Sequence, residues 1–542
     1  MKTFLLVLLE ALSFEICVGL ASAQLPPGSI MTFGTAHSYS VSRPLRDMPR
    51  CPTGFDAVAS TSTNKPNGNF LSDPIVSFDG LHAGELNHDD CFVAGFTASD
   101  DSGAAGFNYY VQVVNTAIAV YNKSGTLQAG PISTTTFWGN QPDCGGNQLW
   151  TDSVVRFDRY ADRWVLCRPG VGPNGQDLCL AVSQTSDPLG RYNQYAFEVN
   201  NIANGLFGFF DDYPKIAVYS DAYYATADPN KIFTGIGNTI SAFDRAAMLN
   251  GDPMPQFVTF FVPAPRSPLR TAHSHMLAAD LDGRRLPPSH TPEYVVQVQD
   301  SNFGFPAGRL QLFEFHVDWN SPSSSRFVPT RSLVPEPFNS EVCSTDDCIK
   351  QPGTNDRLDS LAYGYMMQRM TYRNFGPYQT LLFNHTVAAD GDPSHDHAGI
   401  RWYELRTQTR EQIQTPWEIY QHGTYAPDGH DRWLGSIAMD VNGNIALGFG
   451  VSSNNVYPSL HYAGRRPNDP LGTLPSGDIS LIDGKDVQRH DAEFGDYSQM
   501  TLDPNDDCTF WYTGTYYPTI TIPNDWHTRI GSFRFSDCIS RD

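Results

Sequence analysis

Short apolar runs that end in an aspartate turn recur along most of the chain. In two copies the turn leads directly into a second apolar run: Val154–Asp158 is followed by Arg163–Leu166, and Ser436–Asp440 by Asn444–Leu447. The second copy turns through Asn442-Gly443, which is a strong hairpin signal. The pattern therefore predicts antiparallel hairpins.

Further copies follow at intervals of roughly 60 to 80 residues. They are Ile75–Asp79, Ile216–Asp221, His275–Asp280 and Ser498–Asp503, and Met366–Tyr372 fills one double interval without the aspartate. An Asp-Pro pair follows three of the turns at a near-constant distance, at Asp187, Asp252 and Asp469. Together these marks predict an all-β fold, a seven-bladed β-propeller of four-stranded antiparallel blades. Two unrelated β domains are the alternative.

A ring of sheets has no free edge only if a strand from one end of the chain completes the sheet at the other end. We expect Ser29–Val41 to supply that strand. The predicted domains are a signal peptide at 1–23, an N-terminal segment with the ring-closing strand at 24–70, and the propeller at 71–542. One helix is predicted at Ser241–Leu249, with Ser241 as its cap and Asn250-Gly251 at its end.

The start of the chain predicts export. An apolar run at Phe4–Leu9 is followed by Ala21-Ser22-Ala23, a small-x-small cleavage pattern. Glu10 and Glu15 interrupt the apolar stretch and argue against a retained membrane helix. We therefore expect a secreted, extracellular protein without a membrane span, and a monomer.

Charge and cysteine content refine this picture. The net charge is −22, which disfavours nucleic acid as a partner. Outside the signal peptide nine cysteines remain, an odd number, so we expect four disulfides and one free thiol. The expected local pairs are Cys167–Cys179, Cys343–Cys348 and Cys508–Cys538. Asn122 and Asn384 begin N-glycosylation triplets.

The C-terminal third carries a recognisable pattern. It comprises Asp431–Asp440, Gly495–Pro504, Asp507–Tyr512 and Thr528–Phe533. In these segments the chain resembles a group of poorly characterised secreted proteins with a sialidase-like β-propeller core. The resemblance implies the fold and export but transfers no catalytic residue. The sialidase turn signature S-x-D-x-G-x-T-W is matched only in its first half, at Ser99–Gly103, so sialidase activity is not expected.

The candidate chemistry lies just ahead of the innermost strands, because the starts of these strands converge on one mouth of a propeller's channel. The polar and aromatic residues at these positions are Trp150, Asp152, Asp211, Asp212, Tyr213, His273, His275, Arg369, His430, Arg432, Trp433, Asp496 and Tyr497. They include carboxylates and imidazoles for proton transfer and aromatic rings that can stack on sugars. The chain has no H-E-x-x-H, phosphate-binding loop, G-x-S-x-G or dinucleotide motif.

Two functions fit these residues. The first is a carbohydrate-active enzyme, a glycoside hydrolase or polysaccharide lyase. It would use Asp211, Asp212 or Asp496 as carboxylate and His275 or Tyr213 as proton carrier. The second is a non-catalytic protein that binds carbohydrate or protein, as an adhesin does, at the same mouth. The repeats have diverged, which favours one unique site and therefore the enzyme, with a carbohydrate or glycoconjugate as partner.

Metal binding is not predicted at a defined site. His273 with His275, and His395 with His397, each place two imidazoles on one face of a strand, but no third ligand is fixed. The cofactor left open is a structural Ca²⁺ ion. Its oxygen ligands would come from the Asp doublets at 89–90, 100–101, 211–212, 346–347 and 506–507.

Overall fold

The computed structural model describes most of the chain, in separate ranges. They are residues 25–51, 70–83, 98–145, 152–172, 175–199, 209–231, 237–264, 275–343, 347–390, 397–410, 413–489, 491–519 and 526–540. The predicted signal peptide, Trp150, His273 and His395 lie outside these ranges.

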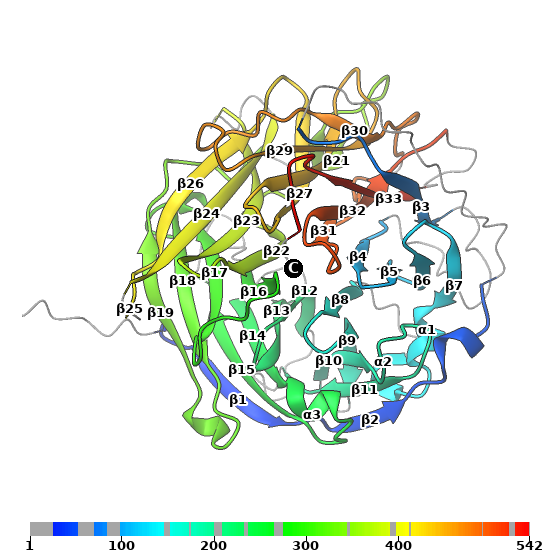
Figure 1. Cartoon of the computed structure of the whole chain (residues 1–542), viewed down its shortest axis with the longest axis vertical. Helices are drawn as coiled ribbons and strands as arrows, with labels where there is room; N and C mark the ends of the chain where they lie inside the picture. Colours follow the sequence, from blue (N-terminus) through cyan, green and yellow to red (C-terminus); the bar gives the residue numbers. More distant parts are fainter. Residues whose placement is uncertain are drawn as a thin grey trace, which may run out of the picture.

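The prediction of an all-β fold is confirmed. Small antiparallel sheets stand side by side around a central axis, as the blades of a propeller do (Figure 1). From the innermost strand outward, the first three sheets contain β4 (Ser102–Ala105), β5 (Tyr109–Val113), β6 (Ala117–Asn122) and β7 (Leu127–Ser133); β8 (Val154–Asp158), β9 (Arg163–Gly172), β10 (Gly175–Ser183) and β11 (Tyr192–Phe197); and β12 (Phe209–Val218), β13 (Ala222–Lys231), β14 (Gly237–Asp244) and β15 (Gln256–Pro263).

The later sheets follow the same plan. They contain β16 (Met276–Asp282), β17 (Glu293–Gln299), β18 (Arg309–His316) and β19 (Arg326–Leu333); β22 (Met366–Asn374), β23 (Tyr378–Ala388), β24 (Ala398–Arg410) and β26 (Glu418–Tyr425); β27 (Asp431–Met439), β28 (Ile445–Ser452), β29 (Ser459–Arg465) and β30 (Ile479–Ile482); and β31 (Gln499–Leu502), β32 (Thr509–Tyr516) and β33 (His527–Arg534). β16 also pairs with β22 in parallel. Short strands β20 (Asp347–Ile349) and β21 (Leu358–Asp359) pair with each other, and β25 (Ile413–Gln414) pairs with β24.

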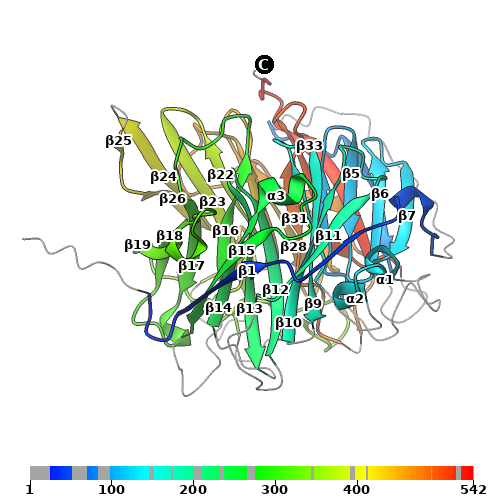
Figure 2. The same cartoon turned by 90° about the horizontal axis from the view of Figure 1, so that it is seen from below.

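The N-terminal strands lie on the outside of the molecule (Figure 2). β1 (Ile30–Thr35) adds to β15, and β2 (Ser38–Val41) adds to β11. The last sheet is completed instead by β3 (Val76–His82), which pairs with β33. The expectation that Ser29–Val41 completes the last sheet was therefore wrong.

The same finding corrects the start of the repeat. The run Ile75–Asp79 belongs to the outer strand β3, so it is not the innermost strand of the first sheet. That place is taken by β4, whose Ser-Gly-Ala-Ala sequence has no bulky apolar side chain. Hydrophobic pattern cannot find such a strand, because small residues pass for a turn.

The predicted helix is shorter than expected. Helix α3 spans Arg245–Leu249, and the Asp244 side chain caps it by accepting a hydrogen bond from the Ala247 amide at 3.0 Å. Ser241 lies in β14, and its hydroxyl is 2.7 Å from that of Thr259. Pairing of β14 with strands on both sides outweighs the helical propensity of this segment. The other α-helices are α1 (Thr134–Trp138) and α2 (Pro142–Gly145).

Two of the three predicted disulfides are present, Cys343–Cys348 and Cys508–Cys538. Cys179 bonds to Cys144 instead of Cys167. In the register of β9 and β10, Cys167 lies opposite Leu180, whereas Cys179 lies opposite Arg168. The two cysteines therefore face opposite sides of the sheet, and Cys167 is a buried free thiol.

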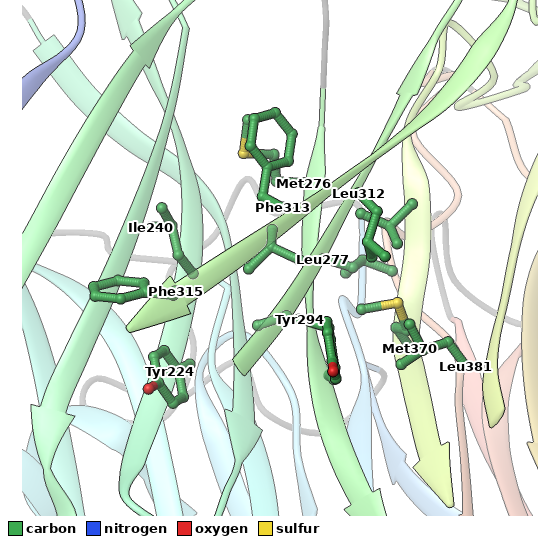
Figure 3. Close-up of a cluster of buried hydrophobic side chains, with 14 of the residues drawn as sticks. Tyr224, Ile240, Met276, Leu277, Tyr294, Leu312, Phe313, Phe315, Met370 and Leu381 are labelled. Atoms are coloured by element: carbon green, nitrogen blue, oxygen red, sulfur yellow. The ribbon is translucent and has the colours of Figure 1, made fainter. Parts of the chain in front are cut away.

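The hydrophobic core lies between the faces of neighbouring sheets. The cluster in Figure 3 joins Ile240 of β14, Leu277 of β16, Phe313 of β18 and Met370 of β22, all buried. Asn384 of β23 is also fully buried, so it cannot be a surface acceptor for glycosylation, and that prediction was wrong. No helix among the described residues has the length and apolarity needed to cross a bilayer.

Candidate active site

The residues that precede the innermost strands share an unusual backbone conformation. A left-handed residue stands two positions before the start of β4, β8 and β22, and two before the point where β12 and β27 resume regular pairing after a bulge. These residues are Asp100, Asp152, Gly364, Tyr213 and Leu434. Bulky residues such as Tyr213, at φ 53°, hold this conformation only where their surroundings enforce it, as active sites often do.

Aromatic rings and an imidazole from different sheets meet at this end of the axis. The rings of His275 and Tyr365 stack with centroids 3.7 Å apart. The Tyr213 ring lies 5.9 Å from His275, 4.9 Å from Tyr365 and 5.8 Å from Tyr497. The Lys215 ammonium lies 4.8 Å from the centre of the Tyr213 ring. A cation, three phenols and an imidazole thus share one small volume, which we call the aromatic cluster.

Within this cluster, His275 has the geometry of an oriented base. Its Nδ1 is bonded to the carboxylate of Asp228 on β13. Burial lowers the pKa of His275, although Asp228 opposes this effect. The imidazole is therefore neutral near pH 7, the form that accepts a proton.

Carboxylates lie beside the aromatic cluster and are linked to it by hydrogen bonds. The Asp496 amide donates to Asp100 at 2.8 Å, and Asn115 donates to Asp100 at 2.6 Å. Asn115 also accepts from the Asp152 amide at 2.8 Å, and Asp152 accepts from the Tyr213 amide at 3.4 Å. Burial raises the pKa of Asp496 well above its usual value, and the neighbouring Asp100 carboxylate adds to the effect. Asp496 can therefore hold a proton to donate.

A cation can be accommodated here as well. One carboxylate oxygen each from Asp100, Glu493 and Asp496 lie within 4.8 Å of one another. Carboxylate oxygens alone suit a hard ion such as Ca²⁺. This triad includes Asp100 from one of the Asp doublets considered as calcium ligands. Asp507 of another doublet instead accepts hydrogen bonds from Arg159 and Arg373.

Of the predicted site residues, the structure brings together Asp152, Tyr213, His275, Asp496 and Tyr497. For Asp211 and Asp212 it describes only the backbone in β12. Trp150 and His273 are outside the described residues. These four therefore remain sequence predictions.

Four predicted residues lie elsewhere. Arg369 is buried in ion pairs with Asp280 and Asp282 on the neighbouring inner strand. Arg432 is bonded to Asp428 and Asp478.

Trp433 is buried against Phe494 in the core. The backbone oxygen of His430 accepts a hydrogen bond from His397 at 3.0 Å. A bulge in β27 interrupts its pairing with β28 between Trp433 and Ser436.

Sequence reasoning missed Lys215, Asp228 and Tyr365, and it named Asp100 only as a possible calcium ligand. Asp100 precedes β4, the strand that apolar pattern cannot reveal. Tyr365 precedes the one repeat that lacks the aspartate turn. Lys215 and Asp228 lie inside strands, where only their positions relative to the axis mark them as site residues.

The chain was compared with known protein families, sequences and structures. No protein-family model and no curated protein sequence matches the chain. Among solved structures, an endo-arabinase from Bacteroides thetaiotaomicron is 12% identical over 60% of this chain and 95% of its own, with a TM-score of 0.28.

Two further solved structures match over more of the chain. The GH93 α-L-arabinofuranosidase of Fusarium graminearum is 8% identical over 69% of this chain and 90% of its own, with a TM-score of 0.33. A polysaccharide lyase of family PL25, an ulvan lyase, is 11% identical over 87% and 96%, with a TM-score of 0.37. None of the three is a sialidase. Likenesses this distant assign no activity, so function must be argued from the site.

Proposed function

We propose that this protein is a carbohydrate-active enzyme that breaks glycosidic bonds at the end of the axis where the inner strands begin. The observation that carries the proposal is the aromatic cluster: Tyr213, His275 and Lys215 from two sheets, with Asp228 holding the imidazole. A base with its orienting carboxylate, a phenol and a cation are the parts that proton-transfer catalysis needs.

The cluster suits β-elimination from a uronic-acid polysaccharide. Neutral His275 would remove the proton next to the sugar carboxylate, whose developing charge Lys215 would stabilise. The bond from the ring to the glycosidic oxygen then breaks, a carbon–carbon double bond forms, and the Tyr213 hydroxyl gives its proton to the leaving oxygen.

Hydrolysis is the second candidate, and the pair Asp100 and Asp496 favours it. Asp496 holds its proton because of burial and the neighbouring carboxylate, as the general acid of a glycosidase does. A second carboxylate of the group would then activate water or attack the sugar. The two reactions share a site but leave different products.

One screen separates these reactions. The purified chain is incubated with neutral and uronic-acid polysaccharides, and both reducing ends and the ultraviolet absorbance of a new double bond are followed. Elimination produces both signals, and hydrolysis produces reducing ends alone. Retention of a polysaccharide without either product would support the alternative of a non-catalytic binding protein.

Variants assign the residues. We expect His275→Gln, Tyr213→Phe and Asp496→Asn to lower activity by about 10²–10⁴-fold where the group transfers a proton. Matched controls are His385→Gln, Tyr223→Phe and Asp440→Asn, buried residues of the same types outside the cluster. Equal losses in variants and controls would contradict the assignment.

The architecture proposed around this site is a closed ring of seven blades. Its support is the order of contacts among innermost strands, β4 to β8, β12, β16, β22, β27 and β31, with β31 again touching β4. We propose the chain as a secreted extracellular monomer with residues 71–542 forming the ring. The disulfides are consistent with export.

A further inference from the structure

A second group of ligand-type side chains lies far from the axis, at the outer side of the sheet β8–β11. His37 lies between β1 and β2, Asp143 lies in α2, and Asp177 lies in β10. The His37 amide donates to the Ala196 oxygen at 3.1 Å, next to the pairing of β2 with β11. Docking of the N-terminal segment on this sheet therefore brings the imidazole to the two carboxylates.

The three side chains are close enough to share one ion. His37 Nε2 lies 2.9 Å from Asp177 Oδ2, and His37 Nδ1 lies 3.9 Å from Asp143 Oδ2. One ligand atom from each residue lies within 4.8 Å of the other two. His37 and Asp143 remain partly exposed, at 27% and 20%, which leaves a path for an ion.

Asp177 has a buried carboxylate oxygen that a bound cation would satisfy. Its side chain has no exposed surface, and its Oδ1 accepts no hydrogen bond from the described residues. A buried carboxylate oxygen without a donor is costly. A cation at this position would remove that cost.

A glycine faces the Asp177 carboxylate and leaves space for it. A Cβ atom on Gly172 of β9 would lie 2.5 Å from Asp177 Oδ2 and 2.7 Å from Oδ1. The disulfide Cys144–Cys179 joins the neighbour of Asp143 to a residue two positions from Asp177, on the same face of β10. The two carboxylates are thus held in place by a covalent link and a glycine.

The charges also require compensation. The groups with the largest electrostatic effect on Asp177 are His37, Asp143 and Glu198. Together with Asp177 itself they make three carboxylates and one imidazole. A different His–Asp pair, His461 with Asp478, is balanced by Arg432 on the same carboxylate. Among the described residues, no arginine forms an ion pair with Asp143 or Asp177.

We propose that His37, Asp143 and Asp177 bind one divalent ion of the zinc type and that this ion fastens the N-terminal strands to the ring. An imidazole nitrogen with carboxylate oxygens is a ligand set of Zn²⁺ and related ions, whereas Ca²⁺ takes oxygens alone. The ion joins His37, which precedes β2, to α2 and β10, so it ties the segment Ile30–Val41 to the sheet.

The test is calorimetric titration of Zn²⁺, and separately of Ca²⁺, into the full chain after treatment with chelator. We expect one saturable Zn²⁺ site. His37→Asn and Asp143→Asn should each weaken Zn²⁺ binding by more than ~100-fold, which exceeds the loss caused by removing a residue that only hydrogen-bonds to a metal ligand. Both residues are partly exposed, so these variants should fold. The control is His316→Asn, because in the described part of the chain His316 pairs with one carboxylate, Glu314. This variant should bind Zn²⁺ as the wild-type chain does.

Hydrogen exchange provides a second readout. Zn²⁺ should slow exchange of the β1 and β2 amides in the unchanged chain but not in His37→Asn, because binding to the folded state stabilises what it joins. The proposal is overturned if Zn²⁺ shows no saturable binding, if both variants bind it unchanged, or if Ca²⁺ binds more tightly than Zn²⁺ at this site.

Discussion

At one end of the axis buried carboxylates meet arginines, whereas at the other end they meet one another, an imidazole and phenols. Where the inner strands end, Asp507 accepts from Arg159 at 2.7 Å and from Arg373 at 3.3 Å. Where they begin, Asp496 lies beside Asp100, and His275 lies among tyrosines. The same residue types therefore serve different purposes at the two ends.

The causes of the pKa shifts differ between the two ends. Burial alone would raise the pKa of Asp507, but Arg373 and Arg159 hold it below its usual value. Burial raises the pKa of Asp282 despite Arg369. For Asp496, burial and a like charge both act upward. A strong shift caused by burial together with a specific charged neighbour is a feature of many functional sites.

The arginine end encloses little free space. Near Arg156, Asp282 and Arg369 the structure has a cavity of about 30 Å³, which is room for one water molecule. Gln499 fills the axis above it, donating to the backbone oxygens of Gly103 at 2.6 Å and Val155 at 3.3 Å. Side chains therefore fill the axis at the arginine end, and we assign these arginines and carboxylates a role in stability.

The largest effect on stability should come from Arg369→Met. It removes the arginine that pairs with both buried carboxylates, Asp280 and Asp282, and leaves Arg156 beside Asp280. Breaking a buried pair typically costs about 3–5 kcal/mol. Denaturant unfolding measures this loss. Arg46→Met is the control, because its pair with Asp187 is exposed and such pairs contribute about 0–1 kcal/mol. If both substitutions lower the free energy of unfolding by the same amount, the arginine end does not have the structural role assigned to it.

A smaller effect, dependent on pH, should come from Asp101→Asn beside the site. Burial raises the pKa of Asp101 to about 7, so the folded state holds a proton that the unfolded state releases near pH 4. The stabilisation this provides is complete below about pH 4 and is lost as the pH rises to about 7, by up to ~1.4 kcal/mol per pH unit. Asparagine does not titrate. The free energy of unfolding of Asp101→Asn, measured with denaturant, should therefore rise relative to that of the wild-type chain between pH 5 and pH 8. The prediction is contradicted if wild type and variant differ in free energy of unfolding by the same amount at pH 5 and pH 8.

Much of the fold follows from local pattern. The hairpins at Val154–Leu166 and Ser436–Leu447 carry apolar runs around a turn, and both are present as β8–β9 and β27–β28. Pairings that join distant parts of the chain were not predictable, because β1, β2 and β3 are equally plausible edge strands by composition. Only the assembled sheets decide which edge each one joins.

The site was predictable to the extent that it follows strand starts. Tyr213, His275 and Asp496 were found because each precedes an apolar run. Arg369 was assigned to the site wrongly because it lies within β22 and pairs with Asp280 and Asp282. Arg432 was assigned wrongly because it pairs with Asp428 and Asp478. Lys215 and Asp228 were missed because a side chain's distance from the axis depends on the register of β12 and β13.

The most direct test compares Asp496→Asn with Asp507→Asn by unfolding in denaturant at pH 7.5. Asp507 has a left-handed φ of 59°, which asparagine also tolerates, so both substitutions remove the ionisable carboxyl with little change of shape. We predict that Asp496→Asn is as stable as the unchanged chain or more so, and that Asp507→Asn is less stable. The account is contradicted if Asp496→Asn proves the more destabilising of the two, because Asp496 would then be a structural residue.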